Sequence, residues 1–199
     1  MPSYVPVALV KEFNHKGILE EDSEARFTGL ADQGVGRRGH FFKASGCPQS
    51  NTVIEVEGIP FNFPDKDMMK YDNIKCSGQK LRPPIGYYSR LHIISFNDVT
   101  QSEDLAELLF EDGTVEKVTL SSLPWGKAGK SEKNDNNFSF VKEFFLAGKS
   151  VLQCKNTLQV DVGCTLCSVE IVNQDKKLSA VLLPENPMLH IFSITLECL

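Results

Sequence analysis

The apolar residues of this chain come in short runs, and nearly every run is bounded by turn-forming residues. The stretch NTVIEVEGIPFNF is the clearest case: Val53 and Ile54 begin it, Val56 continues it, and Gly58 and Pro60 interrupt it before two phenylalanines. Short apolar runs with glycine, proline and small polar residues between them are typical of antiparallel strands. The pattern therefore predicts a many-stranded protein and not a helical one.

Several stretches predict turns between strands. Asp112-Gly113 lies inside AELLFEDGTVEKVTL, and this pair favours the positive φ of a tight hairpin turn. Residues 173–175 are expected to turn the chain within TLCSVEIVNQDKKLSAVLL, and KSVLQCKNTLQVDV is a further candidate for strands. The stretch SEDLAELL has a helix-like start at Ser102, but the hairpin directly behind it favours a short turn or a bulge.

Two six-residue stretches are almost the same, LHIISF at 91–96 and LHIFSI at 189–194. As strands, each would place its first, third and fifth residues on one face and its second, fourth and sixth on an opposite face that is also largely apolar. A strand with two apolar faces is covered on both sides. We therefore expect both stretches to be buried strands of the main sheets, able to lie side by side.

About ten short strands with long loops predict an all-β fold, an antiparallel β-sandwich of jelly-roll type. A chain of 199 residues fits one domain with one substantial core. The polar stretch at about 126–139 is expected to be a mobile loop that does not create a second domain, because it offers only one alanine and one phenylalanine to a core.

Composition excludes several classes of partner. The net charge is −5 with acidic and basic residues interspersed, so no positive stripe indicates binding to nucleic acid. No apolar run is long enough for a membrane span, and no signal peptide is expected. The six cysteines are then expected to be thiols in a cytoplasmic protein. Cys164 and Cys167 should point to opposite faces of one strand and so not share a metal.

Seven stretches follow one another over almost the whole chain: YVPVALVKEFNHKGI, EEDSEARFTG, VEGIPFNFPDK, DNIKCSGQKL, YYSRLHIISF, FEDGTVEKVTLSSLPW and LLPENPMLHIFSIT. Their order resembles that of the accessory β-sandwich modules, galactose-binding-like and of jelly-roll type, that are associated with glycoside-active proteins. The resemblance implies a jelly-roll sandwich without a catalytic constellation of its own and, as its function, binding of carbohydrate.

The candidate ligand-binding residues are Trp125, Tyr87, Tyr88 and Arg90. Aromatic rings stack on the apolar faces of sugars, and arginine offers a fork of hydrogen-bond donors. A structural role is the alternative for each: burial in the core for Trp125, and a tyrosine-lined turn for the other three. Because a sandwich of this size fills its interior with side chains, we expect any ligand to bind on loops at one end.

A calcium site is predicted in the acidic loop, with Glu21, Asp22 and Asp32 as ligands, because Ca²⁺ takes hard oxygen donors. A solvated acidic loop is the alternative. His92 and His190, in the twin stretches, could meet across adjacent strands and bind a metal, although core histidines are the plainer reading.

Three functions follow from these features. The first is a non-catalytic, carbohydrate-binding-like module that uses loop-end aromatic and polar residues. The second is an intracellular protein-interaction or scaffold domain. The third is a metal-dependent hydrolase that uses the two histidines or the acidic loop. Since no recognised catalytic motif occurs in the chain, we expect that it is not an enzyme.

Overall fold

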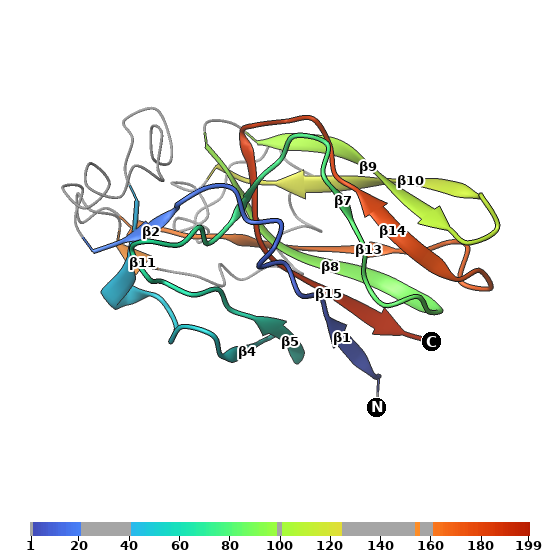
Figure 1. The fold of residues 1–199 in the computed structure, drawn as a ribbon, viewed down its shortest axis with the longest axis horizontal. Coiled ribbons are helices and arrows are strands. Elements are labelled where there is room, and N and C mark those ends of the chain that lie inside the picture. Colours follow the sequence, from blue (N-terminus) through green and yellow to red (C-terminus); the bar gives the residue numbers. More distant parts are fainter. Residues whose placement is uncertain (1, 21–40, 99–100, 125–153, 156–160) are drawn as a thin grey trace, which may run out of the picture.

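The structure is a computed structural model that describes residues 2–20, 41–98, 101–124, 154–155 and 161–199. The stretch predicted to be a mobile loop, 126–139, lies outside these residues. Two antiparallel sheets pack face to face across a hydrophobic core (Figure 1). The predicted β-sandwich is confirmed.

The first sheet has the order β1-β15-β8-β13, and β6 also pairs with the beginning of β15. Its strands are β1 (Tyr4–Pro6), β15 (Leu189–Cys198), β8 (Tyr88–Asn97), β13 (Thr165–Glu170) and β6 (Ile74–Lys75). The second sheet has the order β10-β9-β14-β7. Its strands are β10 (Val115–Ser122), β9 (Ser102–Phe110), β14 (Leu178–Leu182) and β7 (Lys80–Leu81).

The connections between these strands are those of a jelly roll. Along the chain, β7 to β8, β8 to β9, β10 to β13, β13 to β14 and β14 to β15 each pass from one sheet to the other. Only β9 and β10 are joined as a hairpin within one sheet, and the first strand, β1, pairs with the last, β15. Two sheets exchanging strands in this way leave short, protected edges.

Further short elements occur outside the two sheets. They are β2 (Ile18–Leu19), β3 (Phe42–Lys43), the 3₁₀ turn η1 (Ala44–Gly46), β4 (Val53–Val56), β5 (Ile59–Asn62), β11 (Cys154–Lys155) and β12 (Asp161–Val162). β4 and β5 form an antiparallel hairpin, whereas β2 and β3 pair in parallel, an exception to the antiparallel rule predicted from the sequence. Figure 1 shows the β4–β5 hairpin beside β1.

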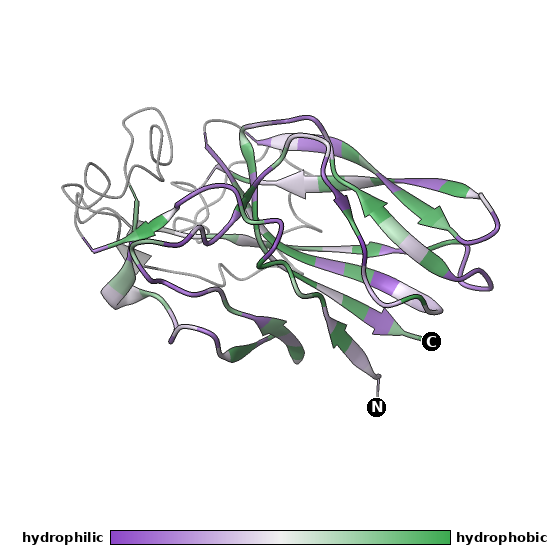
Figure 2. Ribbon diagram, in the orientation of Figure 1, coloured by the Kyte–Doolittle hydropathy of each residue, from purple (hydrophilic) through white to green (hydrophobic). Residues whose placement is uncertain are grey.

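Two hydrophobic clusters lie on opposite faces of the first sheet. The inter-sheet core includes Leu91, Ile93, Ile191, Leu196, Leu108, Phe110 and Leu120. The outer cluster includes Ile94, Phe96, Leu166, Phe192, Phe61, Phe63 and Phe42, so the β4–β5 hairpin and β3 cover the second face. Hydrophobic and polar residues alternate along several strands in Figure 2, as strands with one buried and one exposed face require.

The twin stretches are the two central strands of the first sheet, β8 and β15, and they pair with each other. Leu91 lies opposite Leu196, and Phe96 opposite His190. All residues of both stretches are buried. The predicted burial and side-by-side arrangement are therefore confirmed.

Within the twin stretch of β15, residues 189–194, the predicted alternation fails at one point. Ile191 lies opposite Ser95 and Ser193 opposite Ile94, so Phe192 is an extra residue and the strand bulges. A bulge of one residue shifts every later side chain to the other face. Ile194 consequently joins Ile191 in the inter-sheet core, although the regular pattern predicted opposite faces for these two residues.

The predicted turns have different outcomes. Asp112-Gly113 makes the β9–β10 hairpin, with Gly113 at φ 85°. The turn at 173–175 lies between β13 and β14, but it carries the chain from one sheet to the other. The stretch from Ser102 is neither turn nor bulge but the long strand β9. Gly58 turns the β4–β5 hairpin at φ 78°, and Pro60 lies within β5.

A buried ion pair joins the segment after β1 to the segment before β6. Lys16 Nζ lies 2.9 Å from Asp72 Oδ2, and both side chains have no exposed surface. The ammonium also donates to the carbonyl of Asp67 at 2.8 Å, and the carboxylate accepts the N–H groups of Gly17 and Ile18 at 2.8 and 3.0 Å. A Cβ at Gly17 would meet Asn73 Nδ2 at 2.6 Å, so only glycine fits there.

Cys164 and Cys167 lie on opposite faces of the first sheet, as predicted. Cys164 belongs to the outer cluster and Cys167 to the inter-sheet core. Burial raises the pKa of the Cys167 thiol to about 11.

Nowhere in the described ranges does a helix reach the length and apolar character needed to cross a bilayer.

Candidate functional site

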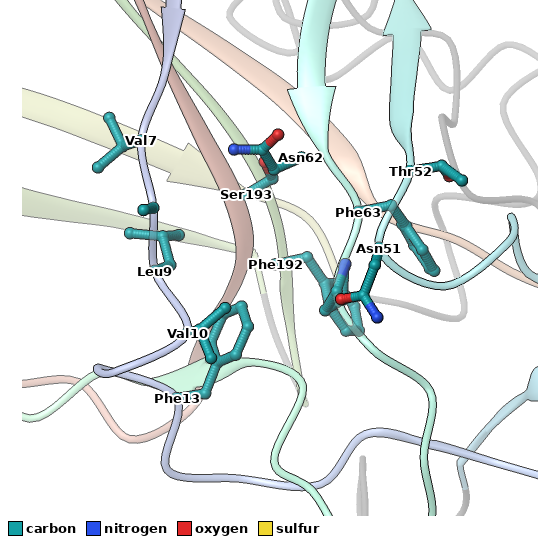
Figure 3. Close-up of a pocket in the computed structure, with 12 residues that line it drawn as sticks. Val7, Leu9, Val10, Phe13, Asn51, Thr52, Asn62, Phe63, Phe192 and Ser193 are labelled. Carbon is teal, nitrogen blue, oxygen red and sulfur yellow. The ribbon is translucent and has the colours of Figure 1, made fainter.

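A cleft of about 190 Å³ opens on the outer face of the first sheet, between the segment that follows β1 and the β4–β5 hairpin. Figure 3 shows Val7, Leu9, Val10 and Phe13 along one wall, Asn51, Thr52, Asn62 and Phe63 along the other, and Phe192 and Ser193 of β15 between them. Ala8 and Pro64 complete the lining.

The β15 bulge places two consecutive residues in this cleft. In a regular strand Phe192 and Ser193 would point to opposite faces of the sheet. Because Phe192 is the bulged residue, both side chains line the cleft. Bulges occur often beside functional sites, where they re-aim a side chain.

Ser193 has a buried hydroxyl that makes no hydrogen bond to the described part of the protein. The residue is only 2% exposed. Thr195, two residues further along β15, differs because its Oγ1 donates to the Pro60 carbonyl at 2.6 Å. A buried polar group without a partner costs about 1–3 kcal/mol, which a ligand hydroxyl could recover by bonding to it.

Aromatic rings form much of the apolar wall. Phe192 is fully buried and packs against Phe42 and Phe96, with ring centroids at 5.6 and 5.4 Å. Phe63 is buried in the same cluster, and Phe13 is half-buried against the inter-sheet core. Because the rings are held by these contacts, the cleft is formed before any ligand binds.

Amide and hydroxyl groups stand at the opening. Asn62 and Asn51 are exposed and Thr52 is half-buried. Asn51 adopts φ 55°, a left-handed conformation that asparagine tolerates, and the Phe63 N–H donates to the Thr52 carbonyl at 2.8 Å. This backbone hydrogen bond between Phe63 and Thr52 joins the segment before β4 to the segment after β5.

None of the described residues that line the cleft is ionisable. General acid–base catalysis needs a side chain that gains or loses a proton. The cleft instead combines aromatic faces with neutral donors and acceptors. This arrangement suits the binding of a neutral ligand that has both hydroxyl groups and an apolar face.

The predicted ligand residues at the start of β8 and just before it do not line this cleft, and not all of them are accessible. Tyr87 is exposed, and Lys177 Nζ lies 5.8 Å from its ring centroid. Arg90 is exposed as well. Tyr88 is buried, its hydroxyl donates to the Pro84 carbonyl at 2.8 Å, and burial raises the pKa of that hydroxyl. For Tyr88 the structure favours the alternative reading, a tyrosine that supports a turn.

Trp125 and the acidic residues Glu21, Asp22 and Asp32 lie outside the described residues. Sugar stacking by Trp125 and the calcium site in the acidic loop therefore stay predictions. Within the described ranges, no three histidine, cysteine, aspartate or glutamate residues gather in a group that could hold a metal ion.

The two histidines of the twin stretches do not lie opposite each other, so the alternative of a metal site formed by the pair is wrong and the interpretation as core histidines is favoured. His92 lies opposite Thr195, whereas His190 lies opposite Phe96. His190 stacks on the Phe96 ring with centroids at 4.7 Å, and its Nδ1 hydrogen-bonds Asn73 Oδ1 at 2.8 Å.

His92 forms a separate hydrogen-bonded group. Its Nδ1 lies 2.8 Å from Ser168 Oγ, and its Nε2 lies 3.2 Å from Glu197 Oε2. Burial lowers the pKa of His92, although the Glu197 carboxylate acts in the opposite direction. These contacts are those of a satisfied core histidine.

The sequence interpretation did not single out the residues that line the cleft. They come from three segments that are distant in the chain, 7–13, 51–64 and 192–193. One signal was available. Ser193 is a polar residue inside a strand with two apolar faces, and a buried hydroxyl there needs a hydrogen-bond partner.

Comparison with known families supplies one match. Residues 3–198 match the model of the AziU2-like beta-sandwich domain, which spans almost the whole chain. A search of curated proteins finds no match to this chain.

Proposed function

We propose that this chain, which belongs to the AziU2-like β-sandwich domain family, is a non-catalytic binding module that holds a carbohydrate in the cleft beside the β15 bulge. The buried Ser193 hydroxyl carries the proposal. It lies just beneath the lining of the cleft, with almost no accessible surface, and has no hydrogen-bond partner among the described residues. A sugar hydroxyl supplies the missing partner when the ligand displaces the side chains that cover Ser193.

The rest of the lining supports a sugar over a purely apolar ligand. Sugar rings have an apolar face formed by C–H groups and an edge of hydroxyls. The half-buried Phe13 and the exposed Val10 offer aromatic and apolar surface, while Asn62 and Thr52 offer amide and hydroxyl groups at the opening. The cleft volume of about 190 Å³ is suited to one ring of a longer glycan.

The resemblance of the chain to accessory modules of glycoside-active proteins is a second support. The site differs from the one expected at Tyr87, Tyr88 and Arg90, because it lies on the outer face of the first sheet. A role for Trp125 or for calcium in the acidic loop is compatible with this site and is tested separately by adding and removing calcium.

A glycan array followed by calorimetry tests the proposal. We expect the protein to bind at least one neutral glycan, and Ser193→Ala and Asn62→Ala to weaken that binding about fivefold to tenfold each, the loss of one hydrogen bond. Thr119→Ala is the matched control, since Thr119 is exposed on β10 in the second sheet. It should leave binding unchanged.

Two outcomes would overturn the proposal. One is the absence of binding to any glycan, with and without calcium. The other is binding that Ser193→Ala and Asn62→Ala leave intact while a variant of Tyr87 or Trp125 abolishes it. The second outcome would return the site to the aromatic residues predicted from the sequence.

A further inference from the structure

A second hollow, a groove of about 330 Å³, lies beside the cleft at the edge of the sandwich. It is bounded by the segment after β1 and by β7 of the second sheet. Its lining includes three basic residues, Lys11, Lys80 and Arg82, together with Glu12. The apolar part of the lining is Val7, Ala8, Leu9 and Leu81.

The three cations of this groove form no ion pair within the described part of the protein. The ion pairs of the described residues engage Lys16, Lys43, Lys70, Lys117, Lys176 and Lys177 instead. Lys11, Lys80 and Arg82 are exposed at the surface. With Glu12 as the single acid, the groove carries a net positive charge in a protein whose overall charge is −5.

The groove and the cleft share a wall. Val7, Ala8 and Leu9 line both hollows. Val7 and Leu9 are buried, whereas Ala8 between them is exposed. We call Ala8 the crest between the two hollows. Because its side chain is small, a ligand has room to pass over it from one hollow to the other.

We propose that the ligand is an acidic glycan, with a neutral ring in the cleft and the carboxylate, sulfate or phosphate of a neighbouring sugar in the groove lined by Lys11, Lys80 and Arg82. This inference rests on the proposed function. Charge-assisted hydrogen bonds to an anion are about twice as strong as neutral ones, and the arginine fork binds two oxygens at once. The groove therefore selects the charge of the ligand, and the cleft holds its ring.

The test uses pairs of probes that differ by one acidic sugar or one acidic group beside a neutral ring: sialyllactose against lactose, and sulfated against unsulfated N-acetyllactosamine. We expect the acidic member of at least one pair to bind at least about tenfold more tightly, and added salt to reduce this preference. The double variant Lys80→Gln, Arg82→Gln should remove the preference and leave affinity for the neutral member unchanged. Lys117→Gln, which removes one positive charge on β10 at the opposite edge of the second sheet from β7, should leave both affinities unchanged.

A crest variant tests the path between the hollows. Ala8→Phe should weaken the acidic member of the pair more than the neutral one, because the ring obstructs the crest. Equal affinity for both members of every pair, or a preference that survives the double variant, overturns the acidic-glycan proposal while the cleft proposal stands. Absence of binding by every probe overturns both.

Discussion

Phe192 and Ser193 are consecutive residues of β15, yet both side chains line the same cleft. The extra residue between Ile191 and Ser193 produces this arrangement in the central strand of the first sheet. It brings a hydroxyl to a position where regular pairing would place an apolar core residue. The bulge therefore links the strand register to the chemistry of the cleft.

The unpartnered hydroxyl leads to a prediction about stability. Ser193→Ala should leave the free energy of unfolding unchanged or raise it by about 1 kcal/mol, since it removes a buried polar group that bonds to no described residue. Thr195→Ala in the same strand should lower it by about 1 kcal/mol, because it leaves the Pro60 carbonyl without its donor. Denaturant unfolding of both variants checks the difference. A loss on Ser193→Ala as large as that on Thr195→Ala would mean that the hydroxyl has a structural partner.

The twin stretches show what the sequence could predict and where it stopped. Two apolar faces require cover on both sides, so the burial and central position of β8 and β15 followed from residue type alone. The bulge did not. LHIFSI alternates equally well with or without an extra residue at Phe192, and only pairing with β8 decides between the two registers.

The cleft could not be predicted from any short stretch of the sequence, for a related reason. Its walls come from the segment after β1, the β4–β5 region and β15, so no short motif contains them. The Tyr87-to-Arg90 stretch has the composition of a sugar-binding turn, but Tyr88 is directed inward. Its approach to Gly86 explains this: a Cβ there would lie 3.0 Å from the Tyr88 hydroxyl, so the glycine admits the ring.

The inter-sheet core gives a second prediction. Ile191→Asp should lower the free energy of unfolding by several kcal/mol, about 3–5, because an unpaired charge would enter a core where Ile191 has no exposed surface. Leu105→Asp is the control, since Leu105 is 58% exposed on β9 and should change stability by less than about 1 kcal/mol. Thermal melting of the two variants measures both effects. A cooperatively folded Ile191→Asp variant with a native melting temperature would contradict the placement of β15.

His92 leads to a prediction about pH. Burial lowers its pKa below the ordinary value of 6.5, so the unfolded chain binds a proton more readily than the folded one. Stability should then be full above pH 6.5 and fall as the pH drops through the folded pKa. The charged groups around the ring are Glu197 on β15, which opposes this shift, and Arg90 on β8, which adds to it.

Replacing His92 removes this source of pH dependence. In His92→Gln the melting temperature should fall less between pH 7.5 and 5 than in the unchanged protein. Ser168 on β13 and Tyr4 on β1 are the other neighbours of the ring. An NMR titration gives the pKa of His92 directly, and a value above 6.5 would mean that the Glu197 carboxylate outweighs burial.

The Lys16–Asp72 pair allows the sharpest comparison, because the same kind of pair also occurs at the surface. Lys16 and Asp72 are fully buried at 2.9 Å, whereas Lys70 and Asp65 lie at 2.8 Å with the lysine side chain 60% exposed. Removing one partner of a buried pair leaves an uncompensated charge and costs about 3–5 kcal/mol, while an exposed pair contributes about 0–1 kcal/mol.

We therefore expect Lys16→Met to lower the free energy of unfolding by about 3–5 kcal/mol and Lys70→Met by less than about 1 kcal/mol, measured by urea unfolding. The loss at Lys16 should be near the lower end, because Asp72 keeps the N–H groups of Gly17 and Ile18 as donors. Asp72→Asn should cost more, since it leaves the ammonium in the core and presents an amide to those same N–H groups. Equal losses for Lys16→Met and Lys70→Met would show that water reaches the buried pair and that the segment after β1 is held by its apolar contacts alone.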